Sequence, residues 1–170
     1  TLSEIIQQVN SAIIWIYNNC KNYGGDKNKI TISGHSAGAH LCAMILENNW
    51  KNYYLPPDII KGAALISGIY QPEIVLNLSV NKEIKLSKNE AIKNTPKSPK
   101  EKIPIILTCV GDQEPEGWIE QTKLYSKNAI NMSSHLDFSI LNDENHFSMM
   151  ISFSNSEHKF VKKLINMAKI

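Results

Sequence analysis

The sequence of 170 residues contains no arginine, and all 18 of its basic residues are lysine. A planar guanidinium that grips a carboxylate or phosphate through two parallel hydrogen bonds is therefore unavailable. The formal net charge is only +2, which is too small to indicate the basic surface that nucleic acids or anionic membranes require. We therefore expect neither nucleic acid nor a membrane as a partner.

Cysteine is scarce, and no hydrophobic run is long enough to span a bilayer. The three cysteines, Cys20, Cys42 and Cys109, are far apart and odd in number. Each falls at an apolar position of a predicted helix or strand, so we predict buried thiols and neither a disulfide framework nor a metal site. No signal peptide is recognisable, and the chain is expected in the cytoplasm.

What the sequence does contain is an ordinary globular composition, with 42% hydrophobic and 20% charged residues. Hydrophobic periodicity predicts helices that alternate with strands. The predicted helices cover 1–23, 37–48, 118–129 and 156–168, and the predicted strands cover 29–33, 59–66, 103–110 and 136–141. This alternation is typical of an α/β fold with a mostly parallel sheet and helices on both faces. We predict one domain over residues 1–170.

Residues 71–101 interrupt the alternation. Prolines punctuate this stretch, and seven lysines lie between Lys82 and Lys102. We predict an excursion outside the sheet with a short helix near 88–94, either as a cap over a site or as a plain surface loop. The lysines are interpreted as a solvated face, with a binding role as the alternative.

The strongest functional signal is Gly34-His35-Ser36-Ala37-Gly38, a G-x-S-x-G match between a predicted strand and a predicted helix. In a nucleophile elbow, the serine occupies a strained strand-to-helix turn, and the amide of the next residue, here Ala37, faces the oxygen of a bound carbonyl. Small residues are expected around the serine, and Gly34, Ala37 and Gly38 meet that need. The alternative is a glycine-rich turn with an idle serine.

A serine hydroxyl needs a base to accept its proton and an acid to orient that base. In α/β-hydrolases the three residues follow in the order Ser, acid, His. His146 lies in a polar loop after the last predicted strand and is the candidate base. The other histidines fit less well; His35 is expected to point away from the site, and His40 to be a packing or supporting residue.

Two acids follow the predicted strand 103–110. Aspartate is the commoner residue type in this role, which favours Asp112. The acid usually comes three residues after the turn glycine in G-x-x-D patterns, which favours Glu114 because Gly111 is that glycine. Position makes Glu114 the preferred candidate, and Asp112 remains the alternative.

These motifs resemble the kynurenine formamidase (arylformamidase) family of α/β-hydrolase serine enzymes. The resemblance rests on GHSAGAHL at 34–41, YGGD at 23–26, ISGIY at 66–70, the segment 111–121 and HF at 146–147. The register of segment 111–121 places the family's acid at Glu114, an aromatic at Trp118 and the family's glutamine at Gln121. Gln71 departs from the pattern, since the family often has aspartate there.

The family carries an H-G-G-type oxyanion loop well before the elbow, and this chain has none. The chain therefore resembles the C-terminal part of the enzyme, and the N-terminal strands and that loop are expected to be missing. The Ala37 amide would be the remaining oxyanion donor, and loss of one donor costs about 100- to 1000-fold in rate. We also expect an unpaired sheet edge and exposed apolar surface that favour aggregation.

The resemblance implies hydrolysis of N-formyl-L-kynurenine to L-kynurenine and formate, with Ser36 as nucleophile, His146 as base and Glu114 as acid. It implies no metal and no organic cofactor. The partner is a small-molecule substrate, N-formylkynurenine or a similar aryl formamide or ester, and a homodimer is left open. The alternatives are a general carboxylesterase of the same fold and a non-catalytic fragment or pseudoenzyme.

Overall fold

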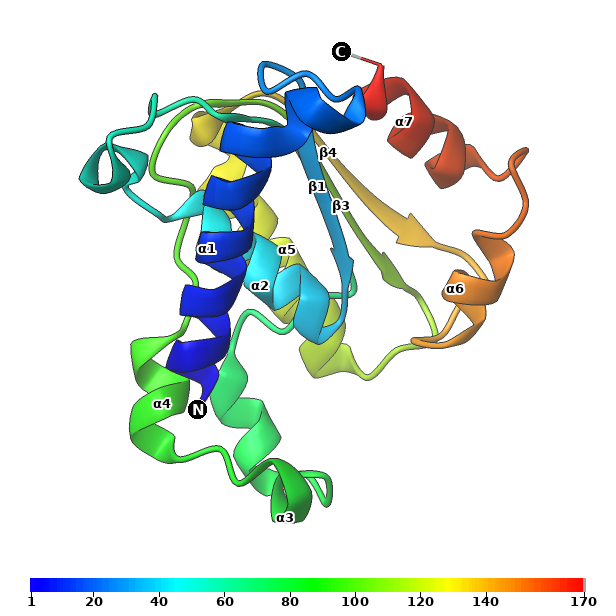
Figure 1. Cartoon of the computed structure of the whole chain (residues 1–170). Helices are drawn as coiled ribbons and strands as arrows, with labels where there is room; N and C mark the ends of the chain where they lie inside the picture. Colours follow the sequence, from blue (N-terminus) through cyan, green and yellow to red (C-terminus); the bar gives the residue numbers. More distant parts are fainter. Residues whose placement is uncertain (170) are drawn as a thin grey trace.

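The computed structural model describes residues 1–169. Its centre is a sheet of four parallel strands in the order β1-β2-β3-β4, so that each strand pairs with the next one along the chain (Figure 1). The strands are β1 (Ile30–His35), β2 (Ile60–Ile66), β3 (Ile103–Gly111) and β4 (Ser133–Leu141). Because the strands are parallel, all four carboxyl ends lie at one edge of the sheet, where the predicted site residues follow them.

The helices of the main layers are α1 (Leu2–Asn19), α2 (Ala37–Leu46), α5 (Glu116–Ala129), α6 (Ser148–Ser152) and α7 (Lys159–Ala168). Short 3₁₀ helices follow α1 (Cys20–Tyr23), α2 (Trp50–Tyr53) and α5 (Ile130–Met132). The chain thus alternates between helices and strands, and the predicted α/β class with a parallel sheet is confirmed. At most ends of the helices and strands, the predicted and the observed bounds differ by a few residues.

Two hydrophobic clusters cover the two faces of the sheet. Ala63 and Leu65 of β2 belong to the cluster that also contains Ile13 of α1, residues of α2, and Tyr125 of α5. The alternate β2 residues, Ala64 and Ile66, belong to the second cluster, which includes residues of α6 and α7. Alternation along a strand buries both faces of β2 and explains its nearly continuous apolar sequence.

The start of β4 was not anticipated. The strand was predicted from Leu136, but it begins at Ser133, where it already pairs with Ile103 of β3. Residues 133–135 are too polar to give a strand signal by themselves. They are extended because β3 supplies hydrogen-bonding groups beside them.

The N-terminal helix begins as predicted. Thr1 and Glu4 form a capping box, in which the Thr1 side chain accepts from the Glu4 amide and the Glu4 carboxylate accepts from the Thr1 backbone nitrogen. The α-helix ends earlier than predicted, because residues 20–23 turn as a 3₁₀ helix before Gly24 at φ +78°. Cys42 and Cys109 are buried as expected, but Cys20 is only partly buried.

Segment 71–101 lies outside the sheet and contains a 3₁₀ helix (Pro72–Asn77), α3 (Asn81–Ile84) and α4 (Lys88–Lys93). It packs against the first turn of α1, at the end of the molecule where the N-terminus lies (Figure 1). Glu90 accepts hydrogen bonds from the amide and hydroxyl of Ser3, and the carbonyl of Asn94 contacts His40 Nε2 at 2.7 Å. These bonds join the segment to both α1 and the elbow helix α2.

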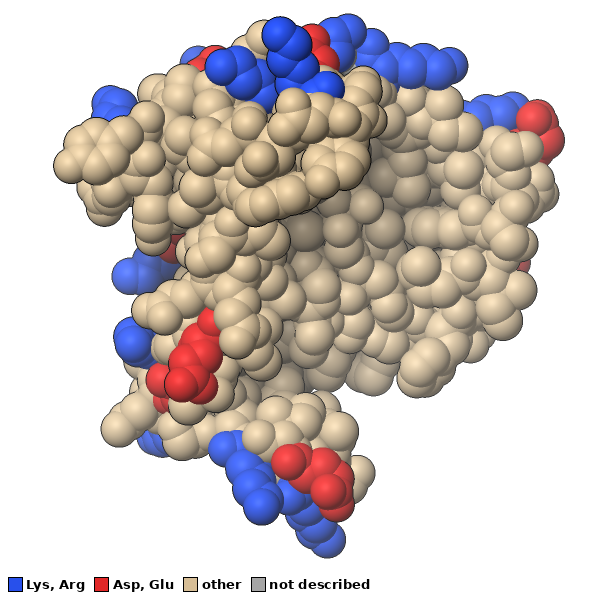
Figure 2. Space-filling view, in the orientation of Figure 1, with Lys and Arg blue, Asp and Glu red and all other residues tan. Residues whose placement is uncertain are grey.

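β1 is an edge strand, because within residues 1–169 no strand pairs with its other side. A cavity of about 510 Å³ runs beside it, lined by residues 29–32 of the strand region and by Ile13, Ile16 and Cys20. Figure 2 shows a hollowed face on which lysine and acidic side chains lie mainly at the margins. Trp15 and Tyr23 are 53% and 75% exposed. Among the described helices, none has the length and apolar character needed to cross a membrane.

Candidate active site

Ser36 sits between β1 and α2 in a strained backbone conformation, with φ 58° and ψ −118°. Non-glycine residues rarely adopt positive φ, and such strain persists only where the surroundings enforce it. Here the Ser36 amide donates to the carbonyl of Ile66 at the end of β2, at 2.9 Å. Helix α2 begins directly afterwards at Ala37. The predicted strand–turn–helix context is therefore present, and the turn raises the Ser36 hydroxyl above the end of β1.

The two glycines of the motif have different roles. A Cβ on Gly34 would lie 2.3 Å from the carbonyl carbon and oxygen of Gly38, so only glycine lets β1 and α2 approach this closely. A Cβ on Gly38 would meet nothing within 4 Å. The expectation that both positions need a small residue is therefore correct for Gly34 and wrong for Gly38, which faces open space.

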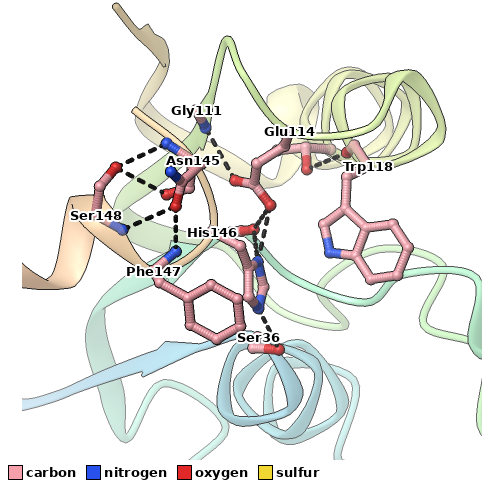
Figure 3. A network of polar contacts seen from close by, with 10 residues as sticks. Ser36, Gly111, Glu114, Trp118, Asn145, His146, Phe147 and Ser148 are labelled. Atoms are coloured by element: carbon pink, nitrogen blue, oxygen red, sulfur yellow. Dashed lines mark hydrogen bonds and ion pairs between the residues drawn. The ribbon is translucent and has the colours of Figure 1, made fainter. Parts of the chain in front are cut away.

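A chain of hydrogen bonds links the three residues selected from the sequence (Figure 3). Nε2 of His146 lies 3.0 Å from Oγ of Ser36, and Nδ1 of the same ring lies 2.8 Å from Oε2 of Glu114. The residues come from the turn after β1, the loop after β4 and the turn after β3, separated by up to 110 positions in sequence. The geometry allows a proton to pass from the serine hydroxyl to an imidazole whose other nitrogen faces a carboxylate.

The structure separates the two candidate acids. The Glu114 side chain is only 1% exposed, and its Oε1 accepts from the Gly111 amide at 3.0 Å. Asp112 lies two residues earlier in the same turn but is exposed, and it has no side-chain contact with His146 in the described part of the chain. Of the alternatives left open by the sequence, Glu114 is the one that the fold brings to the histidine.

Burial opposes ionisation of Glu114, but hydrogen bonds outweigh it. Donors from His146, Ser67 and the Gly111 amide hold the pKa of this carboxyl below its ordinary value of 4.5. The carboxylate is therefore ionised at neutral pH. In that state it can orient the imidazole and stabilise the imidazolium that proton transfer creates.

The loop that presents His146 is fixed on both sides. Oδ1 of Asn145 accepts from the amides of Phe147 and Ser148, each at 3.0 Å, and the Asn145 amide donates to Oγ of Ser148 at 2.8 Å (Figure 3). The carbonyl of Glu144 accepts from the amide of Gln113, which ties this loop to the turn that contains Glu114. The loop that contains the base is therefore hydrogen-bonded directly to the turn that contains the acid.

Two neighbours of the site were missed from the sequence. His35 was expected to point away, but its ring packs against that of His146 with centroids 4.5 Å apart. Burial, with a contribution from His146, lowers the pKa of His35, which favours a neutral ring. Ser67, directly after β2, contacts both Glu114 and His146. The pattern of a parallel sheet could have indicated both, because each stands at the carboxyl end of a strand.

Other predicted neighbours also lie near the site. Trp118 approaches His146 edge-on at 6.3 Å between ring centroids. Oε1 of Gln121 accepts from the amides of Tyr70 and Gln71, at 2.8 and 2.9 Å, and so fixes the chain where it leaves β2. His40 is buried and supports segment 71–101 through Asn94, in keeping with its expected supporting role.

A cavity of about 530 Å³ opens beside the elbow. Its wall combines Ala37, His40 and Leu41 of α2 with Leu2 and Ile5 of α1, and with Ile69, Pro72, Val75 and residues 84–87 and Glu90 from beyond β2.

The Ala37 amide has no acceptor among residues 1–169. It is therefore free to donate to a bound oxygen next to Ser36. Within the same residues, no group of three His, Cys, Asp or Glu side chains is arranged to hold a metal ion.

The arrangement of sheet, elbow and following loops is the α/β-hydrolase fold. A hyperthermophilic esterase from the archaeon Pyrobaculum calidifontis superposes on it with a TM-score of 0.70 at 15% identity, over 96% of this chain and 58% of that one. A profile of the BD-FAE family matches residues 1–53.

Within this fold, the chain is similar to kynurenine formamidase. The enzyme of that name from Danio rerio is 27% identical over 169 residues, which cover 96% of this chain and 56% of the relative. The Salmo salar kynurenine formamidase is 37% identical over 92 residues, 54% of this chain and 30% of the relative. The chain thus spans only about half the length of the Danio rerio relative, and the resemblance drawn from the sequence motifs is confirmed.

The two glycines of the elbow give the first testable prediction. Gly34→Ala should lower the free energy of unfolding by about 3 kcal/mol, because its methyl group meets backbone that cannot rotate away. Gly38→Ala is the matched control and should change it by no more than about 0.5 kcal/mol. Urea denaturation followed by circular dichroism measures both. Equal effects of the two variants would contradict the close approach of the Gly34 and Gly38 backbones.

A second prediction concerns Glu114. Its pKa is depressed in the folded protein, so its stabilising effect is complete above about pH 4.5 and is lost as the pH falls through the lower folded value. Glu114→Gln should lower the free energy of unfolding by about 2 kcal/mol at pH 7 and reduce its decline in acid. Asp112→Asn should leave both unchanged. Urea titrations between about pH 7 and pH 3 distinguish them, and an equal response to Asp112→Asn would refute the assignment.

Proposed function

We propose that this chain belongs to a serine hydrolase that cleaves N-formyl-L-kynurenine to L-kynurenine and formate. The observation that supports a hydrolase is the hydrogen-bonded series Ser36, His146 and Glu114 at one edge of the sheet. The substrate is proposed from the similarity to kynurenine formamidases.

In the proposed mechanism, Ser36 Oγ attacks the formyl carbon as His146 Nε2 accepts its proton. Glu114 orients the imidazole and stabilises its cation. The developing oxyanion is held by the Ala37 amide, which faces the turn without another acceptor in the described chain. The histidine then protonates the aniline nitrogen as the C–N bond breaks. A water molecule repeats the cycle on the formyl-serine and releases formate.

We assign the aromatic part of the substrate to the cavity beside the elbow. The formyl group is too small to need it, whereas about 530 Å³ lies within the range of small-molecule sites. Its lining is largely aliphatic and includes the residue next to the nucleophile. In this arrangement, segment 71–101 supplies one wall of the substrate site. This favours the interpretation of the segment as a cap rather than as a plain surface loop.

A general carboxylesterase is the second candidate. The same cavity suits the apolar acyl or alcohol part of an ester, and the superposed Pyrobaculum calidifontis protein is an esterase. A chain without hydrolytic activity is the third candidate, because within residues 1–169 the Ala37 amide is the one oxyanion donor identified beside Ser36. Both alternatives differ from the formamidase in the assays below.

The nucleophile is tested with a fluorophosphonate probe. The wild-type chain should be labelled, and Ser36→Ala should abolish labelling, because only an activated serine hydroxyl reacts at a useful rate. Ser11→Ala, which removes an exposed hydroxyl in the middle of α1, is the control and should label like the wild type. A soluble, folded wild-type chain that is not labelled would show that this polypeptide is not a working hydrolase by itself.

The substrate class is tested by filling the cavity. Leu41→Trp should reduce kcat/KM for N-formylkynurenine by about tenfold or more, while hydrolysis of a small ester such as p-nitrophenyl formate falls less. Leu124→Trp is the control, because Leu124 is an exposed apolar residue on α5 and is not part of the cavity wall. Efficient ester turnover without any formamide turnover by the wild type would favour the carboxylesterase.

A further inference from the structure

Ser67 lies directly after β2, and its hydroxyl stands between the carboxylate and the imidazole of the site. Its Oγ donates to Oε2 of Glu114 at 2.5 Å and lies 2.9 Å from Nδ1 of His146. The residue is completely buried. The same carboxylate oxygen also lies 2.8 Å from that ring nitrogen. The three groups therefore form a closed triangle of polar contacts with no access for solvent to Ser67.

The donor and acceptor inventory fixes the protons in this triangle. A hydroxyl has one hydrogen and two lone pairs, and the Ser67 hydrogen is directed to the carboxylate. Nδ1 of His146 then faces two acceptors, a lone pair of Ser67 and the oxygen of Glu114. A ring nitrogen in that position carries a hydrogen. Nε2 is consequently the bare nitrogen, which is the form required to accept the proton of Ser36.

The backbone of Ser67 adds an independent observation. It adopts φ 47°, a left-handed conformation that costs a non-glycine residue about 1–2 kcal/mol and that glycine adopts freely. Its amide is held by the carbonyl of Cys109 at 2.7 Å, so the adjacent strand enforces the conformation. The contacts of the hydroxyl with Glu114 and His146 explain why serine, and not glycine, occupies this strained position. Strain of this kind gathers at functional sites.

We propose that Ser67 is a positioning residue that holds the Glu114 carboxylate and keeps the proton of His146 on Nδ1. This inference rests on the proposed hydrolase function for its catalytic meaning. The contacts themselves are independent of any substrate. Ser67 acts through Glu114 and His146 and does not touch the reacting atoms.

Two substitutions distinguish the effect of the Ser67 hydroxyl from the effect of the backbone strain. Ser67→Ala removes the hydroxyl and retains the strained conformation, whereas Ser67→Gly removes the hydroxyl and relieves the strain. Ser126→Ala is the matched control: Ser126 is also a buried serine, but it bonds to Thr108 and Thr122 and not to the site. His35 and Cys109, the other titratable groups near Glu114, remain intact in all three variants.

The first readout is NMR of the folded chain and needs no catalysis. ¹⁵N-labelled histidine reports the tautomer of His146, and ¹³C-labelled glutamate reports the ionisation of Glu114, assigned with Glu114→Gln. Both Ser67 variants should lower the share of the Nδ1–H tautomer and raise the pKa of Glu114, since a donor to the carboxylate is lost. No change in either variant would overturn the proposal. A change in Ser67→Ala alone would assign the effect to the strained backbone and would also overturn it.

The second readout is the rate of fluorophosphonate labelling at Ser36. Both Ser67 variants should label about tenfold more slowly, the rate equivalent of one ordinary hydrogen bond, and Ser126→Ala should be unaffected. Wild-type labelling with unchanged rates in the Ser67 variants would refute the positioning role. A wild-type chain that is not labelled would show instead that this polypeptide is not a working hydrolase by itself, and the NMR comparison would still decide the role of Ser67.

Discussion

Three backbone hydrogen bonds continue the sheet one residue beyond the ends of its strands, and the site depends on them. The amide of Ser36 donates to the last residue of β2, that of Ser67 to the carbonyl of Cys109 in β3, and that of Asp112 to the last residue of β4, at 2.7 to 3.0 Å. Each bond fixes the first residue of a turn against the neighbouring strand. The turns that contain the serine and the acid, and the loop that contains the histidine, are thereby held at constant spacing, although long stretches of sequence separate them.

The same alignment explains why unusual backbone conformations gather here. Ser36, Ser67 and Asp143 all have positive φ, and each follows the end of a strand within two residues. A chain that leaves a parallel strand must turn sharply to avoid the next strand, and glycine would make that turn at the lowest cost. At two of these positions the chain has a serine whose hydroxyl belongs to the polar network. The sheet supplies the free energy that maintains both strained residues.

Much of this site could be predicted from the sequence, because the decisive signals are local. The motif around Ser36 contains its own turn chemistry, and His146 follows a recognisable last strand. Glu114 was preferred over Asp112 by its spacing from Gly111, and the structure supplies the physical reason, since the Gly111 amide itself donates to the carboxylate.

The contacts of His35 and Ser67 with the site could not be predicted from such local signals. Their contacts depend on how neighbouring strands align, and the start of β4 depends likewise on pairing with β3.

The position of β1 at the edge of the sheet has a consequence for how the site is lost. Within residues 1–169, β2 and β3 are each bonded on both sides, whereas β1 is bonded only to β2. Strands with a single partner open more readily than central ones, and their amides exchange hydrogen sooner. The strand that leads into Ser36 is thus among the least protected of the sheet, while the turn of Glu114 follows one of the best protected. Within the same residues β4, which leads into His146, is also bonded on one side only, so both the serine and the histidine follow strands that open more readily than the strand before the acid, and their separation from Glu114 would precede unfolding of the core.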